Sequence, residues 1–377
     1  MKKKILFVAT VVKTHIMEFH IPYLKMLQEM GWETAVAARN DYEDPADCVI
    51  PYCDHYYDIP IARMPWDVSN ITACRQLKEL IDREKYDVIH CHTPVGSVVA
   101  RMAAVDARKK GTSVIYTAHG FHFFKGASLV NWLVYYPVEW AMAQITDVLI
   151  TMNKEDYALA QKRMRKPKIV YTPGVGIDIG RFRNPAVSRR EKRQELGFGD
   201  QDFLILTVAE MTKNKNHSTV LKAMALLKDK AEFENIHYLI CGRGQNEQNL
   251  RREAKALGIE DHVVFLGYRH DVPELLHSAD MFAFMSFREG LSVALMEAMS
   301  SGIPVVCSEI RGNTDLITNE VEGIMAENTP KAVAAAIEKL YHDPQLRKEL
   351  GTAAAEKVKL FGQENVHHIV KDIYLSL

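Results

Sequence analysis

Short apolar runs alternate with amphipathic stretches along the whole chain. In the first half the runs have the length of strands, and apolar residues at helical spacing follow several of them. The runs that predict strands are 5–10, 34–38, 88–91, 114–117 and 148–151. The stretches that predict helices are 17–30, 73–83, 97–109 and 129–143.

The same alternation begins again in the second half, after a Gly/Pro-rich passage at 172–178 and a highly charged stretch at 181–195. We therefore expect two domains, 1–180 and 181–360, with a last helix in 361–377 that crosses back to the first domain. The expected strands are 203–208, 236–241, 263–266, 281–285 and 303–307, and the expected helices are 218–228, 247–257, 292–300, 330–341 and 344–360.

Strands that alternate with helices through short connections are typical of parallel sheets covered on both faces. The pattern therefore predicts an α/β protein with two Rossmann-like domains facing across a cleft. Ligands of open α/β sheets bind at the carboxyl ends of the strands, so the loops that follow strands are the informative ones.

Composition narrows the class of protein. The 377 residues are 47% apolar and 25% charged, which is ordinary for a globular protein, and the net charge of −1 does not favour nucleic acid. The six cysteines form no CxxC pair, so a reduced cytosolic setting is expected. The apolar run after the N-terminal lysines is too short for a membrane span and is interpreted as a strand.

The segment that begins at Arg288 carries two glutamates, Glu289 and Glu297, eight positions apart. Positions eight apart on a helix lie roughly 80° out of line, so two carboxylates for one ligand fit best with Glu289 in a loop and Glu297 in the helix. Gly290, Leu291 and Ser292 between them suit a helix start, whose free N–H groups attract phosphate. The plain alternative is a buried helix with one capping glutamate.

Two further loops of the second half could bind phosphate. Lys213 and Lys215 follow the strand at 203–208 and precede a helix, where a lysine and backbone N–H groups can hold a diphosphate. Arg243 lies between two glycines after the strand at 236–241. An ordinary solvated turn is the alternative in each case.

Several histidines of the first domain lie at or near the ends of predicted strands. His119 follows the strand at 114–117, where it could form a hydrogen bond to a ligand. His90 and His92 flank Cys91 and suggest a metal, but two such ligands without a third and fourth are poor support. We expect core or cleft-lining roles for them and no zinc. No GxGxxG follows the first strand, which argues against an NAD enzyme.

Two amphipathic or aromatic segments, 15–30 and 121–140, could face the cleft. Core packing explains most of their apolar residues. The alternative is that some are exposed beside lysines such as Lys125 and meet a lipid-linked acceptor at a membrane surface.

Together these residues resemble a known family, the retaining glycosyltransferases of family 4, which have the two-domain GT-B fold. The resemblance covers nearly the whole chain and rests on the Glu289–Glu297 pair, His119-Gly120, Lys215 and the turn PGVGID. The stretches HIMEFHIPYLK, IHCHTPVGSVVAR and YTAHGFHFFKG are similar to a bacterial subgroup that builds exopolysaccharide, capsule or related lipid-linked glycans.

The resemblance implies roles for individual residues. Glu289 would hold hydroxyls of the donor sugar, Glu297 the nucleotide ribose, and the backbone at Gly290–Ser292 the β-phosphate. Lys215 would neutralise the diphosphate leaving group, and His119 would contact the donor sugar near the reacting carbon. Preorganised cations and helix N–H groups can stabilise that leaving group, so no metal or other cofactor is expected.

The chain departs from the family pattern at two points. Many members carry arginine where this chain has Glu210, so either Arg243 or Lys213 substitutes, or Glu210 orients Lys215 or reaches another part of the donor. The first loop also lacks the family's paired glycines. His15 and Glu18 stand there instead and are the candidates for the acceptor side.

These expectations describe a cytoplasmic enzyme, peripheral on the inner face of the membrane, that transfers a hexose or N-acetylhexosamine. Its donor would be a nucleotide sugar, with UDP the expected carrier, and its acceptor a glycan or polyprenyl-linked glycan in cell-surface polysaccharide synthesis. No nucleic acid partner is expected. The alternatives are a nucleotide-sugar epimerase on the same fold and a non-catalytic protein that binds sugar nucleotides.

Overall fold

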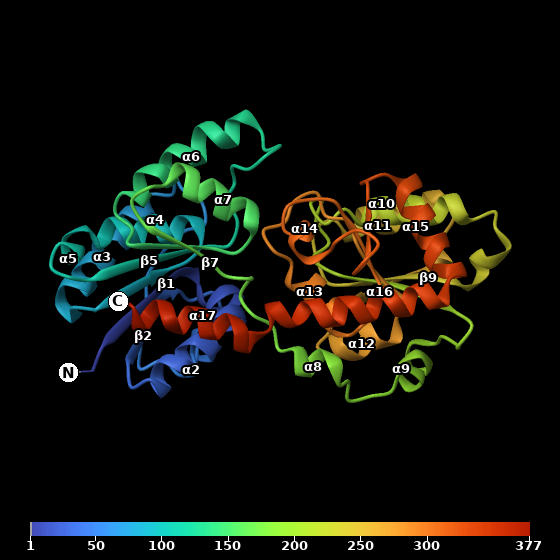
Figure 1. Ribbon diagram of the computed structural model, residues 1–377, viewed down its shortest axis with the longest axis horizontal. Coiled ribbons are helices and arrows are strands. Elements are labelled where there is room, and N and C mark those ends of the chain that lie inside the picture. The colour runs from blue at the N-terminus through green and yellow to red at the C-terminus, as the bar shows by residue number, and fades with distance from the viewer. Residues whose placement is uncertain (1) are drawn as a thin grey trace. The chain divides into compact units, whose positions relative to one another are not determined.

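The computed structural model describes residues 2–377. The chain folds into two compact units (Figure 1): a first unit of the residues up to Val175 with His367–Leu377, and a second unit of Gly176–Val366. The composition shift predicts boundaries at 180/181 and 360/361, a few residues from the divisions at 175/176 and 366/367.

The first unit is built on a parallel sheet whose strands coincide with the continuous apolar runs. Its strands are β1 (Lys4–Val11), β2 (Glu33–Arg39), β3 (His55–Asp58), β4 (Val88–Cys91), β5 (Ser113–Ala118), β6 (Val148–Thr151) and β7 (Lys168–Tyr171). They lie in the order β3-β2-β1-β4-β5-β6-β7, and every neighbouring pair is parallel. The central strands are buried along almost their whole length, as parallel strands covered on both faces must be.

Helices cover both faces of this sheet. They are α1 (Met17–Phe19), α2 (Ile21–Glu29), α3 (Ser69–Glu84), α4 (Pro94–Ala103), α5 (Val105–Arg108), α6 (Leu129–Ala143) and α7 (Lys154–Arg163), with a π-helical turn η1 (Val12–Ile16) and a 3-10 turn η2 (Pro45–Asp47). Figure 1 shows α3, α4 and α6 on one side of the sheet and α2 on the other.

The C-terminal helix α17 (Gln363–Leu375) begins in the second unit, and its residues from His367 onward belong to the first. Tyr374 near its end is buried, and its hydroxyl lies 2.7 Å from Nδ1 of His90 on β4. This confirms the expected return of the last helix to the first domain.

The second unit repeats the architecture with a smaller sheet. Its strands are β8 (Phe203–Val208), β9 (Ile236–Cys241), β10 (Val263–Gly267), β11 (Met281–Phe284), β12 (Val305–Ser308) and β13 (Ile324–Ala326). They are parallel in the order β10-β9-β8-β11-β12-β13. Two α/β units with parallel sheets confirm the fold class expected from the alternation.

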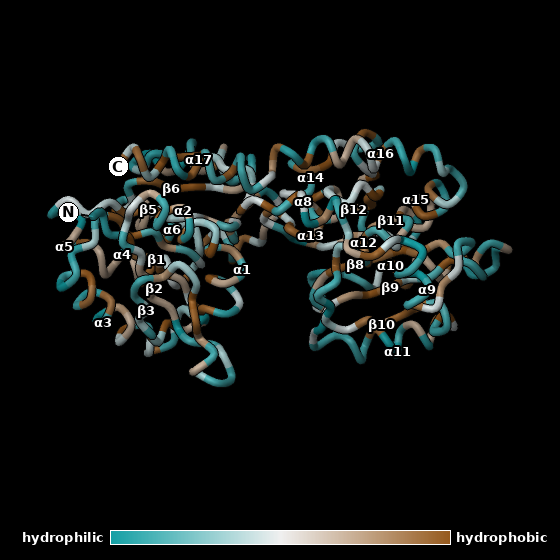
Figure 2. Tube along the Cα trace, turned by 90° about the horizontal axis from the view of Figure 1, so that it is seen from below, coloured by the Kyte–Doolittle hydropathy of each residue, from teal (hydrophilic) through white to brown (hydrophobic). Residues whose placement is uncertain are grey.

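Helices also surround the second sheet. They are α8 (Ile179–Arg183), α9 (Arg189–Leu196), α10 (His217–Leu227), α11 (Glu247–Leu257), α12 (Val272–Ser278), α13 (Val293–Ser300), α14 (Asn313–Leu316), α15 (Pro330–His342) and α16 (Pro344–Lys357), with 3-10 turns η3 (Ala231–Asn235), η4 (Glu260–His262) and η5 (Val358–Phe361). Figure 2 shows hydrophobic segments along strands such as β9 and β10, whereas α11 and α16 are largely hydrophilic. Among the described residues, no helix combines the length and apolarity that crossing a bilayer requires.

The helix expected at 17–30 is interrupted at His20, which separates α1 from α2. Pro22 lies in the first turn of α2, where a missing N–H costs nothing, but inside a continuous helix it would remove a hydrogen bond. The π-helical turn η1 that precedes α1 is a rare geometry that is frequent at functional sites.

Each sheet has one topological switch point, where the chain changes the direction in which it adds strands. In the first sheet it lies between β1 and β4, and in the second between β8 and β11. Open α/β sheets bind ligands in the crevice at the carboxyl ends of such strands. The loops that follow these four strands are therefore the place to look for chemistry.

Candidate functional site

The switch point of the second sheet carries an ion pair. Lys215 lies in the loop after β8 and Glu289 in the loop after β11, and Nζ of Lys215 donates to Oε1 of Glu289 at 2.7 Å. The side chains are only 23% and 12% exposed, so the pair is largely shielded from water. The structure thus brings together two expected site residues that lie 74 positions apart in sequence.

Asparagines tie the two loops of this switch point to each other. Asn214 donates its amide to the carbonyl of Arg288 at 3.0 Å, and its own carbonyl accepts from the N–H of Phe287 at 2.8 Å. Asn216 donates to the carbonyl of Met285 at 3.1 Å from a left-handed conformation (φ 52°), which asparagine tolerates better than most residues. Lys215 is therefore held between two anchored neighbours and faces Glu289.

The residues after Glu289 form the expected start of a helix. Ser292 is the N-cap of α13, and its hydroxyl accepts from the N–H of Leu295 at 3.3 Å. The first turn of α13 presents free N–H groups with the partial positive charge of a helix N-terminus. Glu297 lies within α13 and is partly buried, as the loop-and-helix arrangement of the two glutamates requires.

A neighbouring loop, which follows β12, supports this turn. A Cβ on Gly312, whose φ is 83°, would lie 2.3 Å from the carbonyl oxygen of Gly290, so only glycine fits against it. Arg311 donates Nε to the carbonyl of Glu289 at 3.3 Å. Arg311 was not identified from the sequence, although Gly312 and the start of α14 follow it directly.

The glycines on either side of Arg243 have a structural reason. A Cβ on Gly242 would lie 2.0 Å from the carbonyl oxygen of Ala209, and one on Gly244 would lie 2.4 Å from that of Met211. The loop after β9 is thus packed against the loop that carries Lys215. The glycines are required by this neighbour, and the side chain of Arg243 is exposed beyond them.

Glu210 lies in the loop that carries Lys215, and its side chain is exposed. Lys215 forms its hydrogen bond with Glu289. The backbone carbonyl of Glu210 accepts from Nε2 of His217 at 3.2 Å, while Nδ1 of His217 lies 3.1 Å from the hydroxyl of Tyr238. Burial lowers the pKa of His217 to about 4, so it is a neutral structural residue. Lys213 is exposed.

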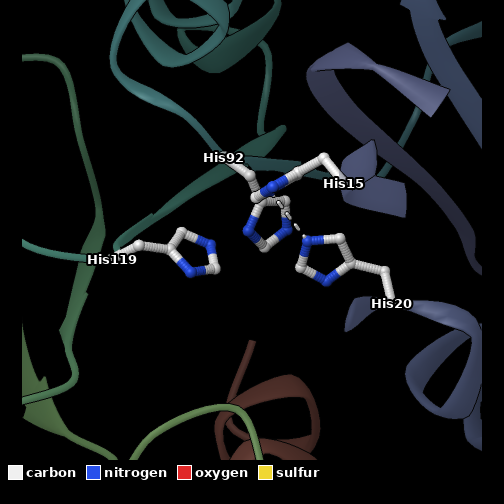
Figure 3. A group of neighbouring side chains, drawn as sticks. All are labelled: His15, His20, His92 and His119. Atoms are coloured by element: carbon white, nitrogen blue, oxygen red, sulfur yellow. Dashed lines mark hydrogen bonds between the residues drawn. The ribbon is translucent and has the colours of Figure 1, made fainter. Parts of the chain in front are cut away.

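The switch point of the first sheet carries four histidines instead of an ion pair. His15 lies in η1 after β1, His20 precedes α2, His92 follows β4 and His119 follows β5. One ring nitrogen from each lies within 4.8 Å of those of the others (Figure 3). The structure therefore joins the expected residues His15 and His119 to His20 and His92, whereas Glu18 is exposed on α1.

Burial keeps this histidine cluster (His15, His20, His92 and His119) uncharged. Desolvation holds the pKa of His15, His20 and His92 well below 6.5, and the neighbouring imidazoles lower it further. The pKa of His119 is lowered to about 4 by burial. All four rings are therefore neutral at pH 7. Each has one nitrogen lone pair, and one lone pair of the His15–His20 pair accepts the hydrogen bond between their Nε2 atoms.

An apolar groove of about 830 Å³ lies among α3, α4 and α6 of the first unit. Trp66 and Ile71 at its rim are 76% and 75% exposed, and Leu129 and Leu133 on α6 are 80% and 76% exposed. Such a concentration of exposed apolar side chains is unusual for a protein surface that meets only water. Core packing therefore accounts for Phe121 and Phe123 but not for Leu129 and Leu133 of α6.

A basic cluster borders the same helix. A second cavity of about 380 Å³ is lined by Trp140 of α6 and by residues at the end of α7 and beyond: Lys162, Arg163, Arg165 and Lys166. Exposed apolar side chains and basic side chains therefore lie next to one another along this helix.

Comparison with known proteins identifies the family. Residues 4–153 match the model of "Glycosyl transferase 4-like" proteins, and residues 188–357 match "Glycosyl transferases group 1". The chain is 40% identical over 378 residues to a Bacillus subtilis protein provisionally named glycosyltransferase EpsD, which covers 99% of this chain and 97% of the relative. The chain belongs to the group 1 glycosyltransferases.

This glycosyltransferase is also similar to proteins of stated substrate. It is 28% identical to the Escherichia coli UDP-Gal:alpha-D-GlcNAc-diphosphoundecaprenol alpha-1,3-galactosyltransferase, over 70% of each chain. Its fold matches that of Anabaena Alr3699/HepE, solved in complex with UDP, with a TM-score of 0.78 over 100% of both chains at 19% identity. The two Rossmann-like units are those of the GT-B fold, as expected.

Proposed function

We propose that this glycosyltransferase transfers a hexose or N-acetylhexosamine, with retention of configuration, from a UDP-sugar to a glycan or polyprenyl-linked acceptor in cell-surface polysaccharide synthesis. The observation that carries the proposal is the Lys215–Glu289 pair beside the N-terminus of α13, at the switch point of the second sheet. UDP is present in a structure that shares the fold, and a relative acts on a diphosphoundecaprenol-linked sugar.

The pair suits a donor that carries a diphosphate and a sugar. Lys215 would leave Glu289 for the diphosphate oxygens, which frees the carboxylate of Glu289 to accept hydrogen bonds from sugar hydroxyls. The N–H groups at Gly290–Ser292 and the start of α13 would bind the β-phosphate. Glu297 would accept from the ribose, and Arg243 would provide a second, mobile cation at the exposed edge of the site.

The reaction breaks the bond between the anomeric carbon and the diphosphate oxygen and forms a bond from that carbon to the acceptor oxygen. The acceptor proton passes to a diphosphate oxygen. Negative charge grows on the leaving group, and preorganised donors stabilise it without reorganisation. In this proposal Lys215 and the helix N–H groups hold the diphosphate, no metal or other cofactor assists that step, and His119 contacts the donor sugar.

The acceptor side is proposed to be the first unit. A polyprenyl chain suits the apolar groove among α3, α4 and α6, and His15 with Glu18 would meet the polar end of the acceptor. The exposed leucines of α6 and the basic residues Lys162–Lys166 would hold the enzyme on the anionic inner face of the membrane. This places the enzyme in the cytoplasm as a peripheral membrane protein.

Nucleotide binding is tested by thermal shift with UDP, GDP and ADP, since a ligand of the native state raises its apparent stability. UDP should give the largest shift. Lys215→Ala should lose most of it, and Lys213→Ala, an exposed lysine of the same loop, should keep it. An equal shift in both variants would remove Lys215 from the donor site. Formation of an epimer from the UDP-sugar in the absence of an acceptor would instead support a nucleotide-sugar epimerase.

Membrane docking is tested by sedimentation with vesicles that contain anionic lipid. Leu133→Glu should weaken vesicle binding, because it places a charge in the exposed apolar face of α6. Leu226→Glu changes an exposed leucine of the second unit and should leave binding unchanged. Docking through α6 would be contradicted if both variants lost vesicle binding equally, or if the unaltered protein did not bind vesicles.

A further inference from the structure

The histidine cluster contains buried polar atoms that have no partner. Among the described residues, neither ring nitrogen of His92 has a hydrogen-bond partner, and the same is true of Nδ1 of His20 and Nε2 of His119. His20 and His92 are only 1% and 2% exposed. Buried polar atoms without partners cost free energy, and in a native structure each requires an explanation such as an ion.

His90 shows that the fold can satisfy a buried histidine at this strand end. It lies two residues before His92 on the same strand end, is equally buried, and its ring centroid is 4.2 Å from that of His92. Both of its nitrogens have partners, the hydroxyl of Tyr374 and that of Thr117, each at 2.7 Å. The fold thus supplies hydroxyl groups to one buried histidine and none to the next.

The spacing of the four rings fits a single metal ion. Two nitrogens bound to one tetrahedral zinc ion at about 2.0–2.1 Å lie about 3.3 Å apart. Nε2 of His15 lies 3.2 Å from Nε2 of His20, close to that spacing. The ligand atoms of all four lie within 4.8 Å of one another, so the widest pair must close by at most about 1.5 Å, which ring rotation on loop residues can supply.

We propose that His15, His20, His92 and His119 bind one transition-metal ion such as Zn²⁺ at the switch point of the first sheet (Figure 3). Neutral imidazole suits zinc, cobalt, nickel and copper, whereas magnesium and calcium require oxygen ligands that the cluster does not offer. The metal would fix η1 and the residue before α2 to the ends of β4 and β5.

The ligands of this site all lie in the first unit, and the phosphate-binding residues lie in the second. The site changes the expectation that His92 has no metal-binding role. His119 can serve both proposals, since Nε2 would bind the metal and leave Nδ1 for a sugar hydroxyl. Metal binding does not depend on the transferase activity, so it can be tested without a substrate.

The test uses the untagged full-length protein, stripped with a chelator, dialysed and titrated with Zn²⁺ and with Co²⁺. We expect one tightly bound ion per chain by elemental analysis and the visible absorption of tetrahedral Co²⁺. His92→Gln and His20→Gln should each weaken binding at least about tenfold, because each removes one ligand. His368→Ala, an exposed histidine, and His217→Gln, a buried one in the second unit, should bind as the unaltered protein does.

Circular dichroism of the metal-free variants separates loss of a ligand from loss of the fold. Should His92→Gln fail to fold, His20→Gln and His119→Gln provide the same comparison from other loops. Equal affinity in the ligand variants and the His368→Ala control would overturn the proposal. So would a cobalt spectrum of octahedral form, or the absence of a tightly bound ion.

Discussion

The two switch points have the same topology and opposite chemistry. After β8 and β11 the loops present a lysine and a glutamate, both charged and joined at 2.7 Å. After β1, β4 and β5 they present four neutral histidines, three of which have a nitrogen without a partner. Parallel strand order therefore determines where a crevice lies, and the loop residues alone decide what can bind in it.

The two sites also differ in what a ligand must do. At the second switch point the polar groups already satisfy each other, so a ligand must separate Lys215 from Glu289 and satisfy both. At the first switch point, a ligand would meet ring nitrogens of His20, His92 and His119 that have no partner to lose. The ion pair therefore suits a substrate that binds and leaves at every turnover, and the histidine cluster suits an ion that stays bound.

The largest expected effect is that of Lys215→Ala. Loss of this cation should lower the rate of transfer about 100- to 1,000-fold, as removal of one preorganised group from a charged transition state does. The measurement is kcat with a UDP-sugar and a polyprenyl-linked acceptor. Lys213→Ala should stay within about twofold, since an exposed lysine gains little from fixed partners. Similar losses in both variants would mean that only the overall charge of the loop matters.

Glu289→Gln distinguishes the role of Glu289 from that of Lys215. Transfer should fall about 10- to 100-fold, the worth of a hydrogen bond to a charged group. Binding of UDP alone, measured by calorimetry, should hold or tighten, because Lys215 then has no carboxylate to leave. Weaker UDP binding would show that Glu289 positions Lys215 instead of competing for it. In that case the pair is a fixed unit, and the contrast with the histidine cluster becomes smaller.

Much of this architecture could be predicted from the sequence, and the strands that were missed share one property. β3, β7 and β13 are edge strands. An edge strand has one pairing partner and less burial, so it needs no continuous apolar run. β3 reads HYYD and has exposed or half-buried positions throughout. The central strands, buried on both faces, matched the predicted runs closely.

The two candidate sites also differ in how far the sequence could predict them. Lys215 and Glu289 each follow a strong apolar strand just before a helix, so sequence position alone marked them. The histidine cluster requires knowledge that β1, β4 and β5 are neighbours, which chain order does not show. His90 and His92 look equivalent in the sequence, yet only the fold shows that Thr117 and Tyr374 satisfy His90 and leave His92 without partners.

Zinc should stabilise the first unit. At a free concentration about 100 times the Kd, an ion that binds only the native state adds about 2.7 kcal/mol to the free energy of unfolding. For a unit of this size that raises Tm by about 5–10 °C. Calorimetry of chelated and zinc-loaded protein measures the shift. His92→Gln should lose most of this shift, whereas His368→Ala should keep it, and a chelator should reverse the shift in the unaltered protein.

The smallest expected effect concerns the start of α13. Ser292→Ala removes the N-cap and should cost about 1 kcal/mol of stability. Because this turn presents N–H groups to the donor, UDP affinity should also fall about two- to fivefold. Thr329→Ala is the matched control: Thr329 caps α15 in the same unit, and both hydroxyls accept at 3.3 Å. It should lower Tm equally and leave UDP binding unchanged, because α15 does not begin at the switch point. Equal UDP binding in both variants would remove the N-terminus of α13 from the donor site and leave Lys215 as its main cation.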